Sequence, residues 1–279
     1  MNLTNYHSHC SFCDGRAPME EFVKAAIESG FTAYGISSHA PISFPSKWAM
    51  KEERLSEYLN EFARLKAKYS GQIEFYSALE IDYLDNLNSP NAARFANIEL
   101  DYKIGAVHFV KTDDGVIIDT DGGLDSFKLN LERYVGGDLT KIIKLYYKAM
   151  MELTEGGGVD FIAHSDKIHF VAESIQPGIS SEVWYNQLRN DLFAFIAERD
   201  LILEINTKAF DTKGVFFPSA NQFKQIKQLG MRVVVNSDAH YPNLINAGRK
   251  AGLEALKAAG INEVQEFHNG SWVATEITL

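Results

Sequence analysis

The sequence predicts one α/β domain, a (β/α) barrel with seven strands instead of the usual eight. Two observations carry this prediction. Short, apolar, β-rich runs alternate with amphipathic helical stretches along the chain, and polar residues suited to catalysis fall where those runs end. Strands that alternate with helices are typically parallel and joined by helical crossovers. The active site of such a barrel lies at the C-terminal ends of the strands, so both observations point to one site.

Seven runs have the composition and length of strands. They cover residues 3–9, 31–39, 73–84, 101–110, 159–166, 201–207 and 231–240. Amphipathic segments between them have apolar residues at helical spacing, and the first two end on Gly30 and Gly71, which are typical helix C-caps. The predicted helices cover residues 19–30, 54–71, 184–200, 220–230 and 243–260.

One segment, from about residue 111 to 137, breaks this alternation. It is rich in Asp and Gly, and we interpret it as an insertion after the fourth strand. Long loops on such scaffolds often cover active sites. No linker or repeat divides the rest of the chain, so we expect a single domain over residues 1–279.

The composition excludes several classes of protein. Of the 279 residues 46% are hydrophobic and 23% are charged, which is typical of a globular domain with a sizeable core. No apolar run is long enough to span a membrane, and the start of the chain does not resemble a signal peptide, so we expect a cytoplasmic protein. The formal net charge of −10 argues against a nucleic-acid partner. It still allows an anionic substrate, because bound divalent cations would reverse the charge locally.

Histidines and carboxylates stand at the ends of six of the seven predicted strands. The residues are His7, His9, His39, Glu80, His108, His164, Asp166, Asp238 and His240. Taken singly, each has an ordinary explanation as a buried histidine, a cap or an ion pair. Two spacings are stronger: side chains at i and i+2 of a strand point the same way, so His7 converges with His9 and Asp238 with His240. It is improbable that histidines and carboxylates stand at the same end of six strands by coincidence. We therefore predict a metal site.

Other polar residues are interpreted differently. His169 and His268 lie outside the strand ends, and we predict that both are structural or solvated. Cys10 and Cys13 form a C-x-x-C, but no second pair completes a four-thiolate zinc site, and we expect them to be packing residues. The sixth strand presents Glu204 and Asn206 instead of a histidine.

The chemistry of the ligand set favours more than one ion. The candidate ligands are His7, His9, Asp14, His39, Glu80, His108, His164, Asp238 and His240. Zinc takes about four ligands, so nine suit a cluster of two or three ions, with Glu80 as the bridging carboxylate. Imidazole with carboxylate favours zinc, iron or manganese over calcium or magnesium. Ions a few ångströms apart are suited to hydrolysis of phosphate esters, because they activate water and neutralise the phosphoryl oxygens.

Seven motifs, spread from Tyr6 to His240, resemble in order those of the PHP family (polymerase and histidinol phosphatase). They are "YHSHCSFCDG", "SSHAP", "ALEIDY", "GAVHFV", "FIAHSDKIHF", "LEINT" and "NSDAH". The set is most similar to the histidinol-phosphate phosphatases of that family. The resemblance implies a distorted seven-stranded (β/α) barrel of the PHP fold with a trinuclear metal centre. It also implies a hydrolase of histidine biosynthesis that converts L-histidinol phosphate and water into histidinol and phosphate, through attack by a metal-bound hydroxide.

The resemblance also divides the ligands among three ions. The first set is His7, His9, Glu80 and Asp238; the second is Glu80, His108 and His164; the third is Asp14, His39 and His240. Many family members have a histidine where this chain has Asp14. Asp14 is therefore either a ligand or the cap of the helix that begins near Pro18.

Six residues are candidates for roles toward the substrate. Asp238 and His240 are the candidates for protonating the leaving alkoxide. Phosphate binding needs cationic side chains, for which we predict Arg16 and Lys208, although both could equally be surface charges. We predict that Glu204 or Asn206 binds the amine of histidinol.

Three other functions compete with this one. The first is another PHP phosphoesterase that acts on nucleotides or nucleic-acid ends, against which the acidic net charge weighs. The second is an amidohydrolase, which usually needs a bridging Lys or carboxylate on the fourth strand, where this chain has His108. The third is a non-catalytic barrel that senses a metal or ligand, although such a protein should have lost several of the ligands.

Overall fold

The computed structural model describes residues 1–279 and contains a barrel of seven parallel strands, as predicted. Their spatial order is β1 (Thr4–Asn5), β2 (Ala33–Ile36), β3 (Glu74–Asp82), β4 (Tyr102–Ala106), β7 (Phe161–Ile162), β8 (Ile202–Asn206) and β9 (Val233–Asn236). Beyond β1 and β9 the chain continues the pairing, with a parallel bridge between Ser8 and Ala239. The His9 N–H donates to the Ala239 carbonyl oxygen at 2.8 Å, and this contact brings the two edges of the barrel together.

All seven strands are shorter than their predicted runs. Five of them end before their polar motif, whereas β3 and β8 contain Glu80 and Glu204 within the strand. The fourth run shows the shortening most clearly. We predicted one strand over residues 101–110, but β4 ends at Ala106. Residues Phe109–Lys111 form β5, which leaves the barrel and pairs antiparallel with β6 (Ile117–Asp119).

The five predicted helices are present, with one correction. They are α1 (Met19–Glu28), α2 (Leu55–Lys68), α6 (Val183–Glu198), α8 (Phe223–Gln228) and α9 (Arg249–Ala258). The predicted helix over residues 243–260 is wrong at its start, since α9 begins only after Gly248, which has a φ of 64°. A Cβ at that position would lie 2.8 Å from the Thr207 carbonyl oxygen, so the chain needs glycine there. Short 3-10 turns lie at Glu52–Arg54, Ala93–Phe95, Ile179–Ser181, Ala220–Gln222 and Pro242–Leu244.

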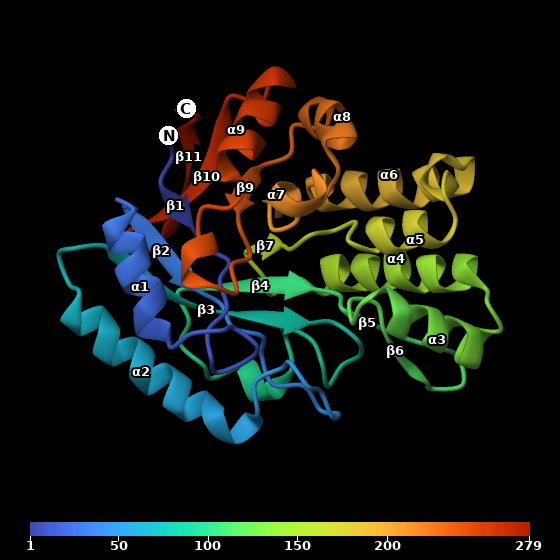
Figure 1. Cartoon of the computed structure of the whole chain (residues 1–279), viewed down its shortest axis with the longest axis horizontal. Coiled ribbons are helices and arrows are strands. Elements are labelled where there is room, and N and C mark those ends of the chain that lie inside the picture. The colour runs from blue at the N-terminus through green and yellow to red at the C-terminus, as the bar shows by residue number, and fades with distance from the viewer.

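Four helices were not predicted: α3 (Leu124–Val135), α4 (Leu139–Gly156), α5 (Ile168–Ile175) and α7 (Phe210–Lys213). The longest, α4, leads into β7 and buries one face that includes Ile142, Ile143 and Tyr146. The segment 111–137 therefore holds the end of the β5–β6 hairpin and α3. In Figure 1 these elements lie to one side of the barrel, and the arrowheads of β3 and β4 point toward them.

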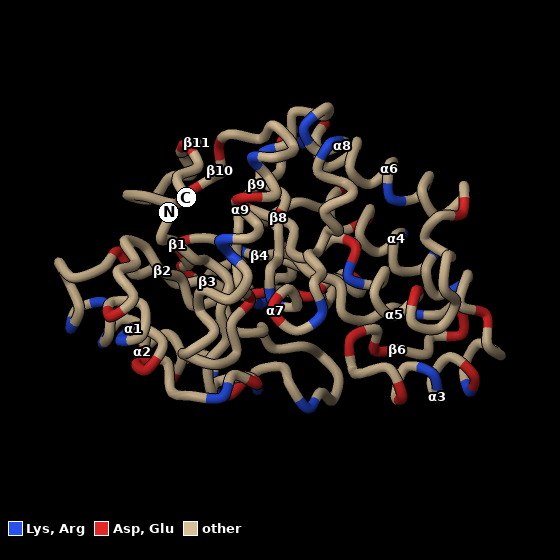
Figure 2. Tube along the Cα trace, turned by 45° about the horizontal axis from the view of Figure 1, so that its top comes forward, with Lys and Arg blue, Asp and Glu red and all other residues tan.

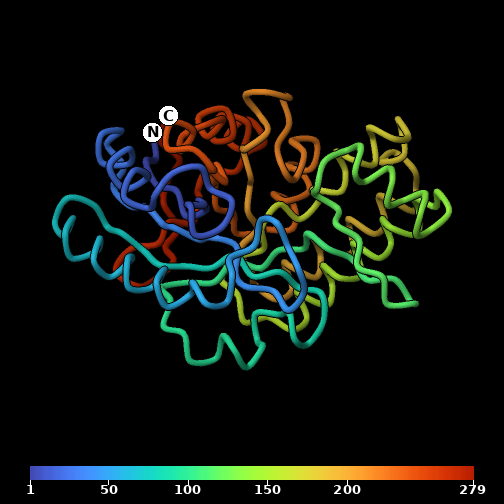
Figure 3. The backbone as a smooth tube through the Cα atoms, turned by 60° about the horizontal axis from the view of Figure 1, so that its bottom comes forward, coloured from blue at the N-terminus to red at the C-terminus, as the bar shows by residue number.

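A C-terminal hairpin, β10 (Glu263–His268) and β11 (Ser271–Glu276), was also not predicted. It lies at the N-terminal end of the strands: His268 contacts Glu74 at the start of β3, and the Trp272 indole N–H donates to Asp160, just before β7. His268 is thus a structural residue of the hairpin. The two chain termini lie side by side in Figure 3, and the Thr278 N–H donates to Asn2 Oδ1 at 2.8 Å.

Two further properties concern the whole surface and the helices. Basic and acidic residues are interspersed along the trace in the view of Figure 2. None of the helices combines the length and the apolar character that a membrane crossing requires.

Candidate metal centre

Glu80, on β3, lies at the centre of a cluster of imidazoles at the C-terminal ends of the strands. Its side chain is buried, and its two oxygens face five histidines. Oε2 lies 2.8 Å from His39 Nδ1, 3.3 Å from His7 Nε2 and 3.5 Å from His9 Nε2; Oε1 lies 2.9 Å from His164 Nε2 and 3.6 Å from His108 Nε2. The predicted convergence of His7 and His9 is therefore present, although both residues lie past the last paired residue of β1.

The remaining three candidate ligands complete the cluster on its open side. Asp238 Oδ1 lies 3.2 Å from His9 Nε2, and His240 Nε2 lies 3.2 Å from Asp14 Oδ1. The backbones of His164 and Asp238 have φ values of 28° and 46°, a strained conformation for non-glycine residues. Such strain clusters at functional sites, where it sets the direction of a side chain.

Asp14 does not cap the following helix. The N-cap of α1 is Pro18, and no side chain caps this end. Asp14 instead turns toward the cluster, with Oδ1 also 3.8 Å from His39 Nε2. Of the two interpretations of Asp14, the geometry favours the ligand.

The ligand atoms form four overlapping groups in which all atoms lie within 4.8 Å of one another. The groups are His9, Asp14, His39 and His240; His7, His164 and Asp238; His7, His9 and Glu80; and His39, Glu80 and His108. Six buried atoms of this cluster form no hydrogen bond, although some of them lie within 3.5 Å of one another. They are His7 Nε2, His9 Nε2, Asp14 Oδ1, His39 Nδ1, Glu80 Oε2 and His164 Nδ1. Because buried polar atoms are almost always paired, a set of unpaired nitrogen and oxygen donors fits bound metal ions.

The pKa values of the buried carboxylates Glu80 and Asp238 are lowered. Burial alone would raise the pKa of Glu80, but the imidazoles of His7, His39 and His108 lower it well below its usual range. Burial acts on Asp238 in the same direction, and Lys208 together with the nearby imidazoles lowers its pKa well below the usual value. Anionic oxygen ligands are thus available for divalent cations.

Outer hydrogen bonds orient the imidazoles. His7 Nδ1 lies 2.7 Å from Glu204 Oε1, and His108 Nδ1 lies 3.0 Å from Asp82 Oδ1. In this tautomer the Nδ1–H donates to the carboxylate and leaves Nε2 free to bind a metal, as is usual for metal-binding histidines. Asp82 was not among the predicted site residues, although its i+2 spacing from Glu80 on the same strand was a usable signal.

The structure does not support the prediction that Glu204 or Asn206 binds the substrate amine. Glu204 is fully buried behind His7, and its oxygens also accept hydrogen bonds from Asn206, Asn236 and the His164 N–H. Asn206 is buried as well, and its amide donates to Glu204 and to Asp238. Both side chains hold the ligands in place from behind, and neither lines the open side.

The open side is a narrow cleft of about 110 Å³. Its lining comprises Asp14, His39, Trp48, His108, Asp121, Gly122, Lys167, Lys208, Asp238 and His240. Lys208 Nζ lies 3.2 Å from Asp238 Oδ1, so its predicted place beside the site is observed. Arg16 is exposed and does not line the cleft, although its backbone N–H donates to the His240 carbonyl oxygen at 2.8 Å. The lining therefore does not support the prediction that Arg16 binds phosphate.

Lys167 is the cation that the sequence analysis missed. It follows the "HSD" motif at the end of the fifth strand, and its ammonium lies 2.7 Å from Asp121 Oδ2. Burial would lower the pKa of Lys167, but the Asp121 carboxylate raises it above its usual value. The cleft therefore presents two ammonium groups next to the metal ligands, which suits an anionic group of a substrate.

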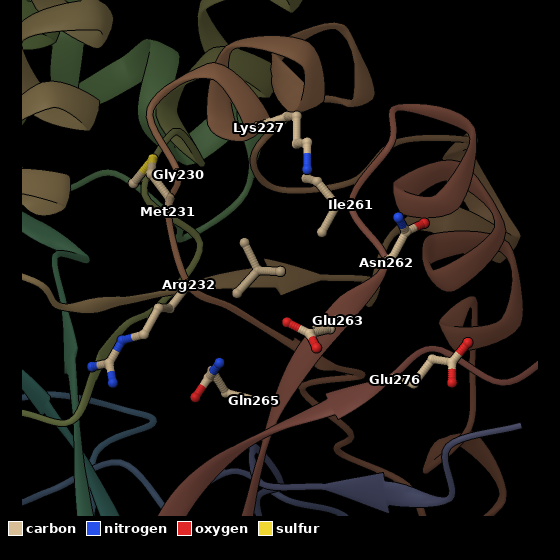
Figure 4. A pocket seen from close by; sticks show the side chains of 10 residues that line it. Lys227, Gly230, Met231, Arg232, Ile261, Asn262, Glu263, Gln265 and Glu276 are labelled. Atoms are coloured by element: carbon tan, nitrogen blue, oxygen red, sulfur yellow. The ribbon is translucent and has the colours of Figure 1, made fainter.

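A second hollow, at the other end of the barrel, holds none of these residues. It measures about 590 Å³ and lies between the start of β9 and the C-terminal hairpin (Figure 4). Lys227, Arg232, Glu263 and Glu276 contribute charges of both signs to its wall. It contains no histidine and is separate from the metal cluster.

Comparisons with known proteins agree with this geometry. A Schizosaccharomyces pombe protein with the name "Probable histidinol-phosphatase" is 26% identical over 95% of this chain and 89% of its own length. The histidinol-phosphatase of Bacillus subtilis is 24% identical over 91% of this chain and 99% of its own length. The histidinol phosphate phosphatase of Lactococcus lactis, solved with zinc, L-histidinol and phosphate, shares the fold with a TM-score of 0.73 and 20% identity, over 98% of this chain and 99% of that chain.

A match to a family model shows the family of this chain. The family model described as the PHP domain matches residues 5–208, which include seven of the nine candidate ligands. Asp238 and His240 lie beyond the match and complete the same cluster in space. The chain belongs to the PHP domain family.

Proposed function

We propose that this chain is a metal-dependent phosphatase that hydrolyses L-histidinol phosphate to histidinol and phosphate, a step of histidine biosynthesis. The observation that carries the proposal is the cluster of nine candidate metal ligands, with Glu80 at its centre, which opens to a cleft with two lysines. Its relatives bear the name histidinol-phosphatase, and the Lactococcus enzyme was solved with L-histidinol and phosphate. We expect the enzyme to act in the cytoplasm.

The proposed cofactors are two or three divalent ions of zinc, iron or manganese. His7, His9, Glu80 and Asp238 would hold the first, Glu80, His108 and His164 the second, and Asp14, His39 and His240 the third. Four overlapping groups of ligand atoms support a cluster rather than a single ion. Bound divalent ions supply activation of water near neutral pH and neutralisation of charge on the phosphoryl oxygens.

The chain's own residues bind and position the substrate. Lys208 and Lys167 face the cleft, where their ammonium groups can hold phosphoryl oxygens as point charges. Asp121 orients Lys167 through its ion pair. Asp238 and His240 line the same cleft and are the candidates for passing a proton to the leaving alkoxide.

The test is phosphate release by protein that has been stripped of metal and reloaded with zinc, manganese or ferrous iron. We expect kcat/KM for L-histidinol phosphate to exceed that for 4-nitrophenyl phosphate by about tenfold or more, since a built site discriminates at least this well. Glu80→Gln should abolish activity, whereas the matched control Glu263→Gln, at the opposite end of the barrel, should retain it.

Each alternative predicts another result in the same assay. Equal rates on the two esters would refute the substrate, and a preference for nucleotides or nucleic-acid 3′ phosphates would favour another phosphoesterase of the family. Fewer than about one bound ion per chain in the purified protein, with no hydrolysis, would favour a sensing role.

A further inference from the structure

We infer that a cavity beside the metal cleft binds the organic part of the phosphomonoester, and that Trp48 and Asp119 make it selective for a planar, cationic leaving group. The inference rests on the proposed function and specifies the substrate class of the same site. The cavity measures about 590 Å³ and shares Trp48 and Gly122 with the cleft. The two spaces therefore adjoin at these residues.

The cleft and the adjoining cavity differ in size and lining, and each suits a different part of the substrate. The cleft, at about 110 Å³, has a single hydrophobic residue in its lining and suits a phosphoryl group. The adjoining cavity is more than five times larger and carries aromatic rings from three parts of the chain, namely Phe44, Trp48, Phe109 and Tyr134. An ester whose phosphoryl group lies among the metal ligands would extend its leaving group past Trp48 into this space.

Trp48 is held in position before any substrate binds. Its ring stacks on Phe109 with centroids 5.0 Å apart and planes within 8°, and its centroid lies 4.4 Å from that of His39. The Trp48 N–H donates to Ser46 Oγ at 3.2 Å, and the Met50 N–H donates to the His39 carbonyl oxygen at 3.2 Å. The loop is thus tied to the end of the second strand, and a rigid aromatic surface binds a planar group at low entropic cost.

Asp119 supplies a negative charge without a cationic partner. It is half-buried at the end of β6, where Oδ1 accepts a hydrogen bond of 2.8 Å from the Asp121 N–H, and it takes part in none of the chain's ion pairs. Its neighbour Asp121, by contrast, is neutralised by Lys167. The one cation in the lining, Lys47, is exposed.

A free carboxylate next to aromatic rings favours a cation. An ammonium or imidazolium group gains both a charge-assisted hydrogen bond and a cation–π contact in such surroundings. Asp119 therefore takes the role that the sequence analysis assigned to Glu204 or Asn206.

Three phosphomonoesters separate the two contributions: L-histidinol phosphate is aromatic and cationic, 4-nitrophenyl phosphate is aromatic without a cation, and glycerol 3-phosphate is neither. In metal-loaded Asp119→Asn, kcat/KM for histidinol phosphate should fall about tenfold relative to kcat/KM for 4-nitrophenyl phosphate. The reason is that the variant loses one charge-assisted hydrogen bond to the cationic ester. For Trp48→Ala, we expect the ratio of either aromatic ester to glycerol 3-phosphate to fall about tenfold, with partial recovery in Trp48→Phe.

Matched controls are Asp125→Asn, on the exposed start of α3, and Trp184→Ala, on α6; neither residue lines the cavity. Metal content of each variant is measured in parallel, since Trp48 touches His39. Equal losses on all three esters, or unchanged ratios, would overturn the inference while leaving the phosphatase intact. A mixed result would separate the two proposals. If the wild type did not prefer histidinol phosphate to 4-nitrophenyl phosphate, the substrate assignment and the role of Asp119 would fail. The aromatic cavity would still stand if Trp48→Ala lowered the preference for 4-nitrophenyl phosphate over glycerol 3-phosphate.

Discussion

Glu80 is the residue that five imidazoles share, and its position explains its charge. A carboxylate that is fully buried would ordinarily hold a proton, but here the surrounding imidazoles lower its pKa well below the usual range. The same imidazoles leave several ring nitrogens unpaired. These nitrogens are available to bind metal ions, and substitution of single residues of the cluster should therefore change the metal content of the protein.

Asp14 provides the sharpest test of the third ion. Its carboxylate lies 3.2 Å from His240 and 3.8 Å from His39, on the more exposed side of the cluster. We expect Asp14→Ala to lose about one ion per chain relative to wild type, because a site of three ligands is left with two. Asp14→His should keep that ion, since an imidazole is also a zinc, iron or manganese ligand.

The measurement is elemental analysis of the purified variants after dialysis against the same metal buffer. Asp113→Ala, at an exposed carboxylate of the β5–β6 turn, is the control. A full complement of ions in Asp14→Ala would contradict the role of Asp14 as a ligand.

Glu204 should act through His7. Its Oε1 accepts the Nδ1–H of His7 at 2.7 Å and so presents Nε2 to the metal. Loss of such an outer partner typically weakens metal binding 10- to 100-fold, and we expect about this effect for Glu204→Gln. Titration against a chromogenic chelator measures it, with Glu263→Gln as the matched control; unchanged affinity would show that His7 needs no support from Glu204.

At the scale of the elements, the barrel depends on close packing between strands that lie apart in the sequence. Gly35, on β2, faces the interior, where a Cβ would lie 1.8 Å from the Tyr102 hydroxyl of β4. Tyr102 is buried and its hydroxyl donates to the carbonyl oxygen of Tyr6. The glycine at this position leaves room for an aromatic side chain that spans the barrel.

Gly35→Ala should therefore destabilise the fold without touching the metal ligands. Overpacking of a well-packed core costs about 1–3 kcal/mol, and we expect a loss of unfolding free energy in this range. A thermal melt of the metal-free protein measures it. Gly156→Ala, at the end of α4, is the control, because the nearest atom to its Cβ would be 3.9 Å away. Equal melting temperatures for both variants would contradict the packing argument.

The β5–β6 hairpin and the segment that leads into α3 line the open side of the metal cluster. They supply Asp119, Asp121 and Gly122 to the two adjoining spaces, while the loop after β2 supplies Trp48. We interpreted residues 111–137 as an insertion, and part of this segment lines both spaces. In the proposed enzyme, selectivity would reside in these segments outside the barrel strands, and the candidate metal ligands lie at the ends of the barrel strands.

At the scale of the whole molecule, metal binding and folding are linked. Ligands from both ends of the chain meet in the cluster, and an ion that binds only the folded state adds stability by mass action. At a free metal concentration of 100 times Kd the gain is about 2.7 kcal/mol. We expect chelation to lower the melting temperature and re-addition of metal to restore it.

Differential scanning fluorimetry with and without chelator makes this measurement. Asp238→Ala, which lacks a ligand from the C-terminal part of the chain, should show a clearly smaller shift on metal addition. If the chelator removes the metal but the melting temperature does not change, the proposed link between metal binding and stability is contradicted.

Much of this protein can be read from local sequence patterns. Each strand and its terminal His or carboxylate are neighbours in the chain, so alternation and i, i+2 spacing predicted the seven strands and the residues that form the cluster. The helices α3, α4 and α5 and the C-terminal hairpin were missed. Their segments were not recognised as amphipathic helices or as paired strands, and their buried faces show only once the packed core is known.

The tertiary structure alone decided which side chains face the open cleft. Glu204 follows the strand pattern of a site residue, yet it is buried behind His7, a residue 197 positions away in the chain. Arg16 follows the first motif directly but lines neither space, whereas Lys167 lines the cleft and Asp119 lines the adjoining cavity. Local sequence patterns were thus sufficient to predict the barrel and the side chains that meet in the cluster, because both follow from short-range spacing. Access to the substrate depends on how distant segments pack together, and no local pattern contains that information.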